Sequence, residues 1–294
     1  MNTVKTFVLM LVLSGILIIA GYLTGGMTGL IVAVILSLGL NFFTYWSSDK
    51  LALRMAGAHE VTEEDDRELH QIVDEQTSQA GIPKPRVYII NSDSPNAFAT
   101  GRNPKNAAIA VTTGIRRLLN RDELSAVIAH ELAHVGNRDT LIMTMVATMA
   151  MAIGLMAYIG YFMSFFRRSG GYGALAGIGG MLIVWLVLPF VATLIRMAIS
   201  RSREYDADAT GARTSRNPHA VASALEKLEM GTQRSPMKVN EATAHLFIVN
   251  PLSGGSSHGH THNSLSGGGF SRLFSTHPPI QDRVKRLREM RIGW

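Results

Sequence analysis

Four long apolar runs without a charged side chain constrain this chain more than any other feature of its sequence. The runs are residues 7–23, 27–46, 140–166 and 169–195. A helix needs roughly 20 apolar residues to cross the hydrocarbon core of a bilayer, and each run has about that length. Only 17% of the residues are charged, which is low for a soluble domain. The runs therefore predict membrane-spanning helices.

Short connectors divide the four runs into two pairs. Thr24-Gly25-Gly26 is a turn signal between the first two runs, and Arg167-Arg168 separates the last two. The first run alone could be a signal peptide, but no small-residue cleavage site follows it and a second apolar run begins at once. The second pair could be buried core helices, although its uncharged runs are long for that. Two transmembrane hairpins are the preferred interpretation.

The two hairpins divide the chain into four parts. These are an N-terminal transmembrane hairpin (1–50), the first part of a soluble domain (51–139), a second transmembrane hairpin (140–200) and the remainder of the soluble domain (201–294). Most cations near the spans lie on the side of the soluble segments: Lys5, Lys50, Arg54, Arg138, Arg196, Arg201 and Arg203. The positive-inside rule places that side in the cytoplasm. Arg167 and Arg168 are exceptions, which a shallow or re-entrant second hairpin would remove.

The soluble segments contain patterns of both helix and strand. Helices are expected from Thr62 to the residue before Gly81, from the capping residues Asn120 and Asn217, and over 282–288. Strands are expected over 86–90, 97–100 and 107–112, the last two joined by a turn-rich loop. The expected fold class is α+β and mainly helical: paired transmembrane helices with a soluble domain that carries a small sheet.

The most specific chemical motif is His130-Glu131-Leu132-Ala133-His134. In a helix, residues i and i+4 lie on one face, so both imidazoles can reach one metal ion. Glu131 lies beside them and can accept the proton of a water molecule at that ion. The chain has no cysteine, which leaves His, Asp and Glu as candidate ligands. The alternative is two surface histidines on an ordinary helix.

A hydrolytic zinc site needs a third protein ligand and an open position for water. Glu204 and Asp208 follow the last apolar run and are spaced i and i+4 on an expected helix. One carboxylate could bind the ion while the other accepts the N–H of a ligating imidazole. An exposed acidic helix start, paired with Arg201 and Arg203, is the alternative.

Three further segments carry weaker signals. Residues Asn96, Ala97, Phe98 and Ala99 begin a short strand, and an edge strand can bind an extended peptide by main-chain pairing; an ordinary strand is the alternative. His277 precedes two prolines, so it is held extended and could donate to an oxyanion, or could simply enter a helix. A Gly/Ser-rich loop contains His258, His260 and His262, which are more typical of solvated loop residues than of a metal site.

Together these motifs resemble the HtpX family of bacterial membrane zinc endopeptidases, relatives of the eukaryotic CaaX-prenyl proteases. The resemblance covers essentially the whole chain and rests on His130–His134, Ser202–Asp208, Asn96–Gly101 and Thr276–Pro279. It implies a zincin-type metalloprotease domain of the HExxH…ExxxD gluzincin type. It implies one Zn²⁺ per chain, bound by His130, His134 and Glu204, with Glu131 as the base and Asp208 supporting a ligating histidine.

The resemblance also implies a location and a substrate class. A member of this family is a multi-pass protein of the bacterial inner (plasma) membrane with its catalytic domain in the cytoplasm. It cleaves misfolded or damaged membrane proteins in a stress response, so its partners are membrane-protein polypeptides and the lipid bilayer. No nucleic acid is expected, because the basic residues lie close to the spans and no aromatic-basic module is visible.

The main alternative is a metal-binding or metal-transport membrane protein without protease activity, which the His-rich loop suggests. Transporters place ionisable ligands inside their spans, whereas the four apolar runs here contain no Asp, Glu or His. An intramembrane protease would carry its HExxH motif within a span. Here the motif lies between the charged segments 121–123 and 138–139, so it is expected outside the bilayer.

Overall fold

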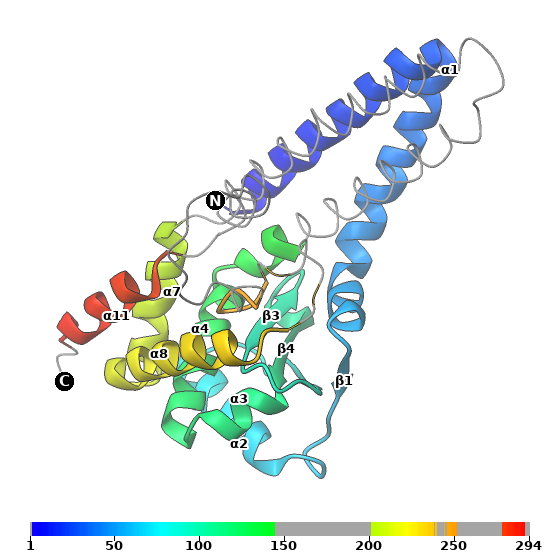
Figure 1. The fold of residues 1–294 in the computed structure, drawn as a ribbon. Coiled ribbons are helices and arrows are strands. Elements are labelled where there is room, and N and C mark those ends of the chain that lie inside the picture. Colours follow the sequence, from blue (N-terminus) through cyan, green and yellow to red (C-terminus); the bar gives the residue numbers. More distant parts are fainter. Residues whose placement is uncertain are drawn as a thin grey trace, which may run out of the picture.

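The computed structural model describes residues 2–144, 201–237, 239, 244, 246–251 and 278–291. A long helical hairpin, α1 (Asn2–Met55), extends from a mainly helical domain with one small mixed sheet (Figure 1). The strands are β1 (Ala58–Glu60), β2 (Arg86–Ile90), β3 (Ala97–Gly101) and β4 (Ala107–Thr112). The other helices are α2 (Arg67–Ala80), the 3₁₀ helix η1 (Pro104–Asn106), α3 (Thr113–Leu118), α4 (Arg121–Gly136), α7 (Arg201–Thr214), α8 (Pro218–Arg234) and α11 (Ile280–Glu289). The mainly helical fold with a small sheet is confirmed.

Two helical legs form α1 and meet at Gly26, inside the expected turn. Gly26 has φ 58° and ψ −141°, outside the helical region, and the chain reverses there (Figure 1). The legs lie so close together near this end that a Cβ on Gly29 would meet the carbonyl oxygen of Gly21. Farther along, Nδ2 of Asn41 donates to Oγ of Ser14 across the two legs at 2.7 Å. The first expected hairpin is therefore present as a helical hairpin.

Large apolar side chains lie exposed along α1. Leu11, Leu38 and Phe42 are 71%, 67% and 68% exposed, far from the burial expected in the core of a soluble protein. The stretch Gly26–Ser47 is long and apolar enough to cross a membrane, and a shorter apolar stretch covers Met10–Ile19. Of the expected second hairpin (140–200), residues 145–200 lie outside the described part of the chain.

The sheet has the strand order β1-β2-β4-β3, in which β2 and β4 are parallel and the other pairs antiparallel. All three expected strands are confirmed, whereas β1 was not predicted. Every residue of β4 is buried because both faces of the sheet are covered. Ile109 and Val111 pack toward α2 and α4, while Ala108 and Ala110 pack against the end of α1.

Side-chain caps fix where the helices begin. Asn120 and Glu123 form the expected capping box of α4, in which each side chain accepts a hydrogen bond from the other residue's backbone N–H. Asn217 caps α8, with Pro218 at its first position. Both predicted helix starts are confirmed. They position α4, which carries the HExxH motif, and α8, which packs against it.

The predicted start of the second helix was wrong. Residues Thr62 and Asp65 instead form a separate turn, in which the Asp65 carboxylate accepts hydrogen bonds from the backbone N–H and the hydroxyl of Thr62. Asp66 then caps α2 by accepting from the N–H of Leu69. Short polar side chains compete with helical backbone bonds in this way, and the helix begins five residues later than expected. Gly81 ends α2 in the left-handed conformation, as expected.

A larger side chain at Gly29 is expected to separate the legs of α1. Because the chain has no cysteine, Ser14→Cys and Asn41→Cys together place one reporter pair across the hairpin. Oxidation should cross-link this pair efficiently, and Gly29→Leu should abolish the cross-link. Gly39→Leu is the matched control, since a Cβ there meets nothing within 4 Å. Equal cross-linking in the two leucine variants would contradict the close approach at Gly21 and Gly29.

Candidate metal centre

Helix α4 places His130, Glu131 and His134 in the interior of the domain. They are 0%, 3% and 5% exposed, and the two imidazole centroids lie 4.9 Å apart. Helix α7 packs directly on this part of α4 (Figure 1). The contact requires Gly211, because a Cβ at that position would lie 2.9 Å from the backbone of His130. Because Glu204 lies on the same helix as Gly211, this close approach brings its carboxylate to the two histidines of α4.

The side chains of His130, His134 and Glu204 converge on one point. One donor atom from each lies within 4.8 Å of the others. Nε2 of His134 is 3.6 Å from Oε1 of Glu204, and Nε2 of His130 is 4.0 Å from Oε2 of Glu204. An ion bound at about 2 Å to each of two donors holds that pair within about 4 Å. Both carboxylate–imidazole distances meet this limit, so the three residues can share a divalent cation.

The opposite edges of the two imidazoles face carboxylates. Nδ1 of His130 lies 3.1 Å from Oδ1 of Asp208, and Nδ1 of His134 lies 3.3 Å from Oδ2 of Asp139. Each carboxylate favours a proton on Nδ1 and leaves Nε2 to bind a metal. Asp208 thus lies where a supporting role for a ligating histidine requires it. Asp139 was not predicted to take part, although its position five residues after His134 brings it within reach of that ring.

A second residue that the sequence analysis missed is Arg283 of α11. Its side chain is fully buried, and it donates from Nε and Nη2 to the two carboxylate oxygens of Asp208 at 2.8 and 2.6 Å. Its Nη1 lies 3.7 Å from Oε2 of Glu204. The available signal was the position of Arg283 beside Val284 and four residues before Leu287, on the apolar face of a helix. Buried arginines are rare unless they are paired.

Burial and local charges shift the pKa values of this cluster. Burial raises the pKa of Glu131 to about 7, which suits a group that takes up and releases protons near neutral pH. Burial alone would lower the pKa of His134, but Asp139 and Glu204 outweigh that effect and raise it to about 9 in the metal-free protein. Burial would raise the pKa of Asp208, yet Arg283 holds it at about 2.

The predicted substrate strand β3 is an edge strand of the sheet, next to α4. The backbone N–H of Ala99 donates to Oε2 of Glu131 at 2.9 Å, so β3 is in direct contact with the carboxylate of the HExxH motif. Phe98 is fully buried and packs edge-on against Phe247, with ring centroids 5.1 Å apart. The strand is therefore adjacent to the cluster, while the Phe98 side chain belongs to the core.

The segment 246–249 lies along the outer edge of β3. The N–H of Ile248 donates to the carbonyl oxygen of Ala97 at 3.0 Å, and Nδ2 of Asn96 donates to the carbonyl oxygen of Val249 at 2.7 Å. Phe247 and Ile248 also line a cavity of about 10 Å³ beside His130 and Glu131. Such a cavity holds about one water molecule. His277 and the loop residues His258, His260 and His262 lie outside the described residues.

The fold and the buried cluster are those of an HExxH metallopeptidase, and comparisons with known proteins agree. The profile described as Peptidase family M48 matches residues 63–291. The chain is 47% identical over 294 residues to a protein named Protease HtpX homolog from Persephonella marina, covering 99% of this chain and 98% of that one. A protein of the same name from Pyrococcus furiosus is 48% identical over 294 residues, covering 98% of this chain and 95% of that one. The chain belongs to peptidase family M48.

A solved structure shows a similar fold. The crystal structure of S. mikatae Ste24p aligns with a TM-score of 0.52 and 16% sequence identity, covering 92% of this chain and 61% of that one. The similarity extends beyond the residues that the family profile matches.

Substitutions in the cluster are expected to lower metal affinity to different degrees. Glu204→Ala removes a donor atom, so the purified protein should lose most of its metal. Asp208→Asn and Asp139→Asn weaken only the support of an imidazole, and each should cost about 10–100-fold in affinity. The measurement is metal content by mass spectrometry together with competition by a chelator. A metal-loaded Glu204→Ala protein beside an empty Asp208→Asn protein would reverse the two roles.

Because of the ion pair between Asp208 and Arg283, the free energy of unfolding of the metal-free protein should depend on pH in the acidic range. The pKa of Asp208 falls from 3.8 to about 2 on folding, so its contribution is present above the unfolded value and is lost as pH falls through about 2. Asp208→Asn should therefore lower the free energy of unfolding by about 2 kcal/mol near neutral pH. The deficit should shrink between about pH 4 and pH 2.

Denaturant unfolding in detergent with a chelator present measures this effect. Asp206→Asn is the matched control, because Asp206 lies exposed on the same helix and should show no comparable deficit. A deficit for Asp208→Asn that stays constant down to the lowest pH would show that the ion pair is not its source.

Proposed function

We propose that this chain is a membrane-anchored zinc metalloendopeptidase that hydrolyses peptide bonds of misfolded or damaged membrane proteins at the cytoplasmic face of the bacterial inner membrane. The observation that carries the proposal is the convergence of Glu204 on the two histidines of α4, with Glu131 beside them. Membership of peptidase family M48 supports the reaction type. The relatives named Protease HtpX homolog support it over the whole length of the chain.

We assign His130, His134 and Glu204 as the ligands of one Zn²⁺ per chain. Two imidazole nitrogens and one carboxylate oxygen form the donor set that hydrolytic zinc sites use, and no cysteine is available. When bound, zinc supplies activation of water and polarisation of the substrate carbonyl. Asp208 and Asp139 hold the rings of His130 and His134 in the orientation that this binding requires.

Glu131 acts as the general base of the proposed reaction. It can accept a proton from the attacking water and then transfer that proton to the leaving amine. In the metal-free protein, burial raises its pKa to about 7. The hydrogen bond from the N–H of Ala99 fixes the direction of its carboxylate. We also assign His277 as a donor to the oxyanion that develops on the substrate carbonyl, because a neighbouring proline restricts its backbone.

An extended substrate is proposed to pair with the outer edge of β3. The main-chain groups of Ala97 and Ala99 point outward there, and both are now occupied: Ile248 donates to Ala97, and Ala99 donates to Glu131. A cavity of about 10 Å³ has no room for a peptide. Segment 246–249 must therefore move away from Asn96 and Ala97 before a substrate can pair with β3.

The membrane placement follows from α1 and from the apolar residues after α4. Gly26–Ser47 supplies a span, and Met10–Ile19 the core of its partner leg. We propose domain borders at residues 50, 139 and 200, which would put His134 and Glu204 a few residues from the bilayer. Peptide bonds in juxtamembrane or cytoplasmic segments are then within reach, whereas bonds at mid-depth are not. A non-helical backbone would lack hydrogen-bond partners there.

Glu131→Gln is expected to abolish proteolysis while the metal stays bound. Removal of a general base should cost about 100-fold or more in rate, whereas the three ligands are unchanged. The assay combines casein cleavage by the detergent-purified protein with metal analysis of the same sample. Glu64→Gln, an exposed site with the same chemical change, is the control and should keep full activity. Activity of Glu131→Gln within a few-fold of wild type would refute the assigned role.

A further inference from the structure

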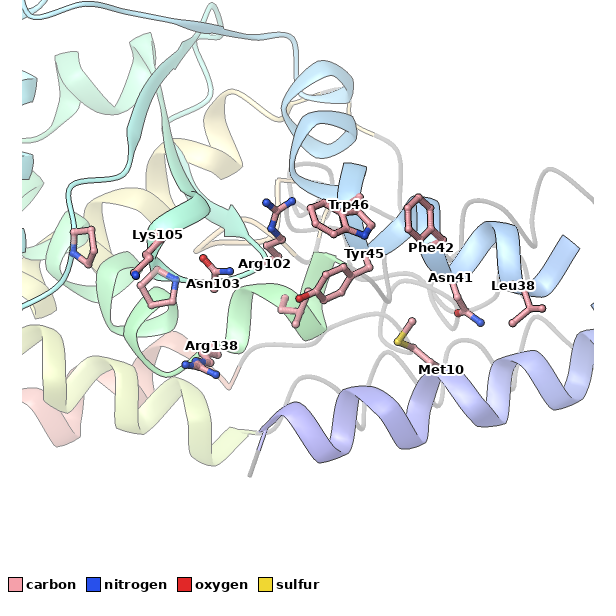
Figure 2. Close-up of a pocket in the computed structure, with 13 residues that line it drawn as sticks. Met10, Leu38, Asn41, Phe42, Tyr45, Trp46, Arg102, Asn103, Lys105 and Arg138 are labelled. Atoms are coloured by element: carbon pink, nitrogen blue, oxygen red, sulfur yellow. The ribbon is translucent and has the colours of Figure 1, made fainter. Parts of the chain in front are cut away.

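A cavity of about 960 Å³ lies where α1 meets the loop after β3 and the end of α4 (Figure 2). It is separate from the small cavity at the histidines, since the two share no lining residue. Both legs of α1 contribute, with Met10 on one and Leu38 and Phe42 on the other. Its size is typical of a pocket for a small amphipathic molecule. No part of the proposed proteolytic reaction uses it.

One wall of this cavity is apolar and belongs to the span. Leu38 and Phe42 lie within Gly26–Ser47 and are 67% and 68% exposed. Tyr45 and Trp46 follow at the end of that span and face the protein domain (Figure 2). Tyr and Trp at this position are typical of the interface between acyl chains and headgroups. The cavity therefore extends from the depth of acyl chains to the depth of lipid headgroups.

The other wall is cationic. Arg102, Lys105 and Arg138 line it, and no carboxylate does so among the described residues. The guanidinium of Arg102 lies 4.3 Å from the centre of the Trp46 ring, which holds it at the interface. Two acidic residues that adjoin lining residues in the sequence have other partners. Asp49, three residues after Trp46, pairs with Arg86, and Asp139, next to Arg138, pairs with His134 and Arg203. Among the described residues, these three cations therefore line one site together with no acidic side chain.

We propose that this cavity binds an anionic phospholipid of the surrounding leaflet. The phosphate diester lies among Arg102, Lys105 and Arg138, and an acyl chain lies along Leu38 and Phe42. Basic pockets beside membrane helices suit such headgroups. A zwitterionic lipid would bring its ammonium group toward three cations, and free phosphate would leave the apolar wall uncovered. The proposal rests on the membrane placement of α1 given above.

The site adjoins the candidate metal centre through two short loops. Arg102 follows β3 directly, and Arg138 precedes Asp139, the partner of His134. The hydroxyl of Thr140 donates to the carbonyl oxygen of Gly101 at 3.0 Å and joins these loops. A bound lipid therefore contacts both segments that flank the metal ligands. It would hold the catalytic domain at a fixed height on the leaflet.

The test is lipid retention by the full chain. The protein is placed in nanodiscs of mixed phosphatidylcholine and phosphatidylglycerol, extracted with detergent and examined by native mass spectrometry. Wild type should retain phosphatidylglycerol selectively, and added inorganic phosphate should not displace it. Each cation contributes roughly fivefold in affinity, so Arg102→Gln/Lys105→Gln/Arg138→Gln should bind roughly a hundredfold more weakly. The single variants Lys105→Gln and Arg138→Gln, at exposed positions, should each bind the phospholipid roughly fivefold more weakly.

Arg67→Gln/Arg234→Gln/Lys285→Gln is the matched control, with the same loss of charge at exposed sites on the soluble domain. It should retain the lipid as wild type does. Equal retention by the cavity and control variants, or displacement by phosphate alone, would overturn the proposal. A protein that enters nanodiscs and proteolyses casein but retains no phosphatidylglycerol overturns this site only. Failure to enter nanodiscs would refute the membrane placement and the lipid site together.

Discussion

The rest of the catalytic domain depends on the buried ion pair between the guanidinium of Arg283 and the carboxylate of Asp208. A charge without solvent is strongly unfavourable unless it is paired and hydrogen-bonded, so Arg283 fixes its partners as firmly as they fix it. Asp208 receives two hydrogen bonds from it and faces His130 with the same carboxylate. One ion pair thereby sets the relative positions of α11, α7 and α4. The geometry of the proposed metal ligands depends on that arrangement.

Steric fit at Gly211 works together with this ion pair. The ion pair joins α11 to α7, and the missing side chain at Gly211 lets α7 come close to the backbone of His130 on α4. Glu204 lies two turns before Gly211, so any increase in the separation of the helices withdraws the third donor from His134. A site of only three protein ligands tolerates little displacement, since each donor must lie about 2 Å from the ion. The packing at Gly211 and the ion pair of Arg283 therefore both affect the distance between Glu204 and the two histidines.

The contact between β3 and Glu131 links substrate binding to the base. The strand that is proposed to pair with a peptide donates a hydrogen bond to the carboxylate that is proposed as the general base. Segment 246–249 occupies the remaining edge and fills the space beside the histidines. A protease with a permanently open site would cleave proteins indiscriminately. The described conformation instead admits little more than a water molecule.

Local sequence patterns were sufficient to predict those elements whose formation depends on residues only a few positions apart. The i and i+4 spacing of His130 and His134, the cap at Asn120 and the turn at Gly26 each depend on near neighbours, and all three are confirmed. The start of α2 was wrong because Asp65 bonds back to Thr62, a local competition between two polar residues that the helix pattern alone does not resolve.

What the sequence by itself determined was the membrane-sized apolar runs, the motif on one helix face and the pool of candidate ligands. Only the tertiary structure brought Arg283 to Asp208 and Ile248 to Ala97. These two pairs join residues that are 75 and about 150 positions apart, and no periodicity encodes such contacts. They arise when helices and strands pack and each buried polar group must find a partner.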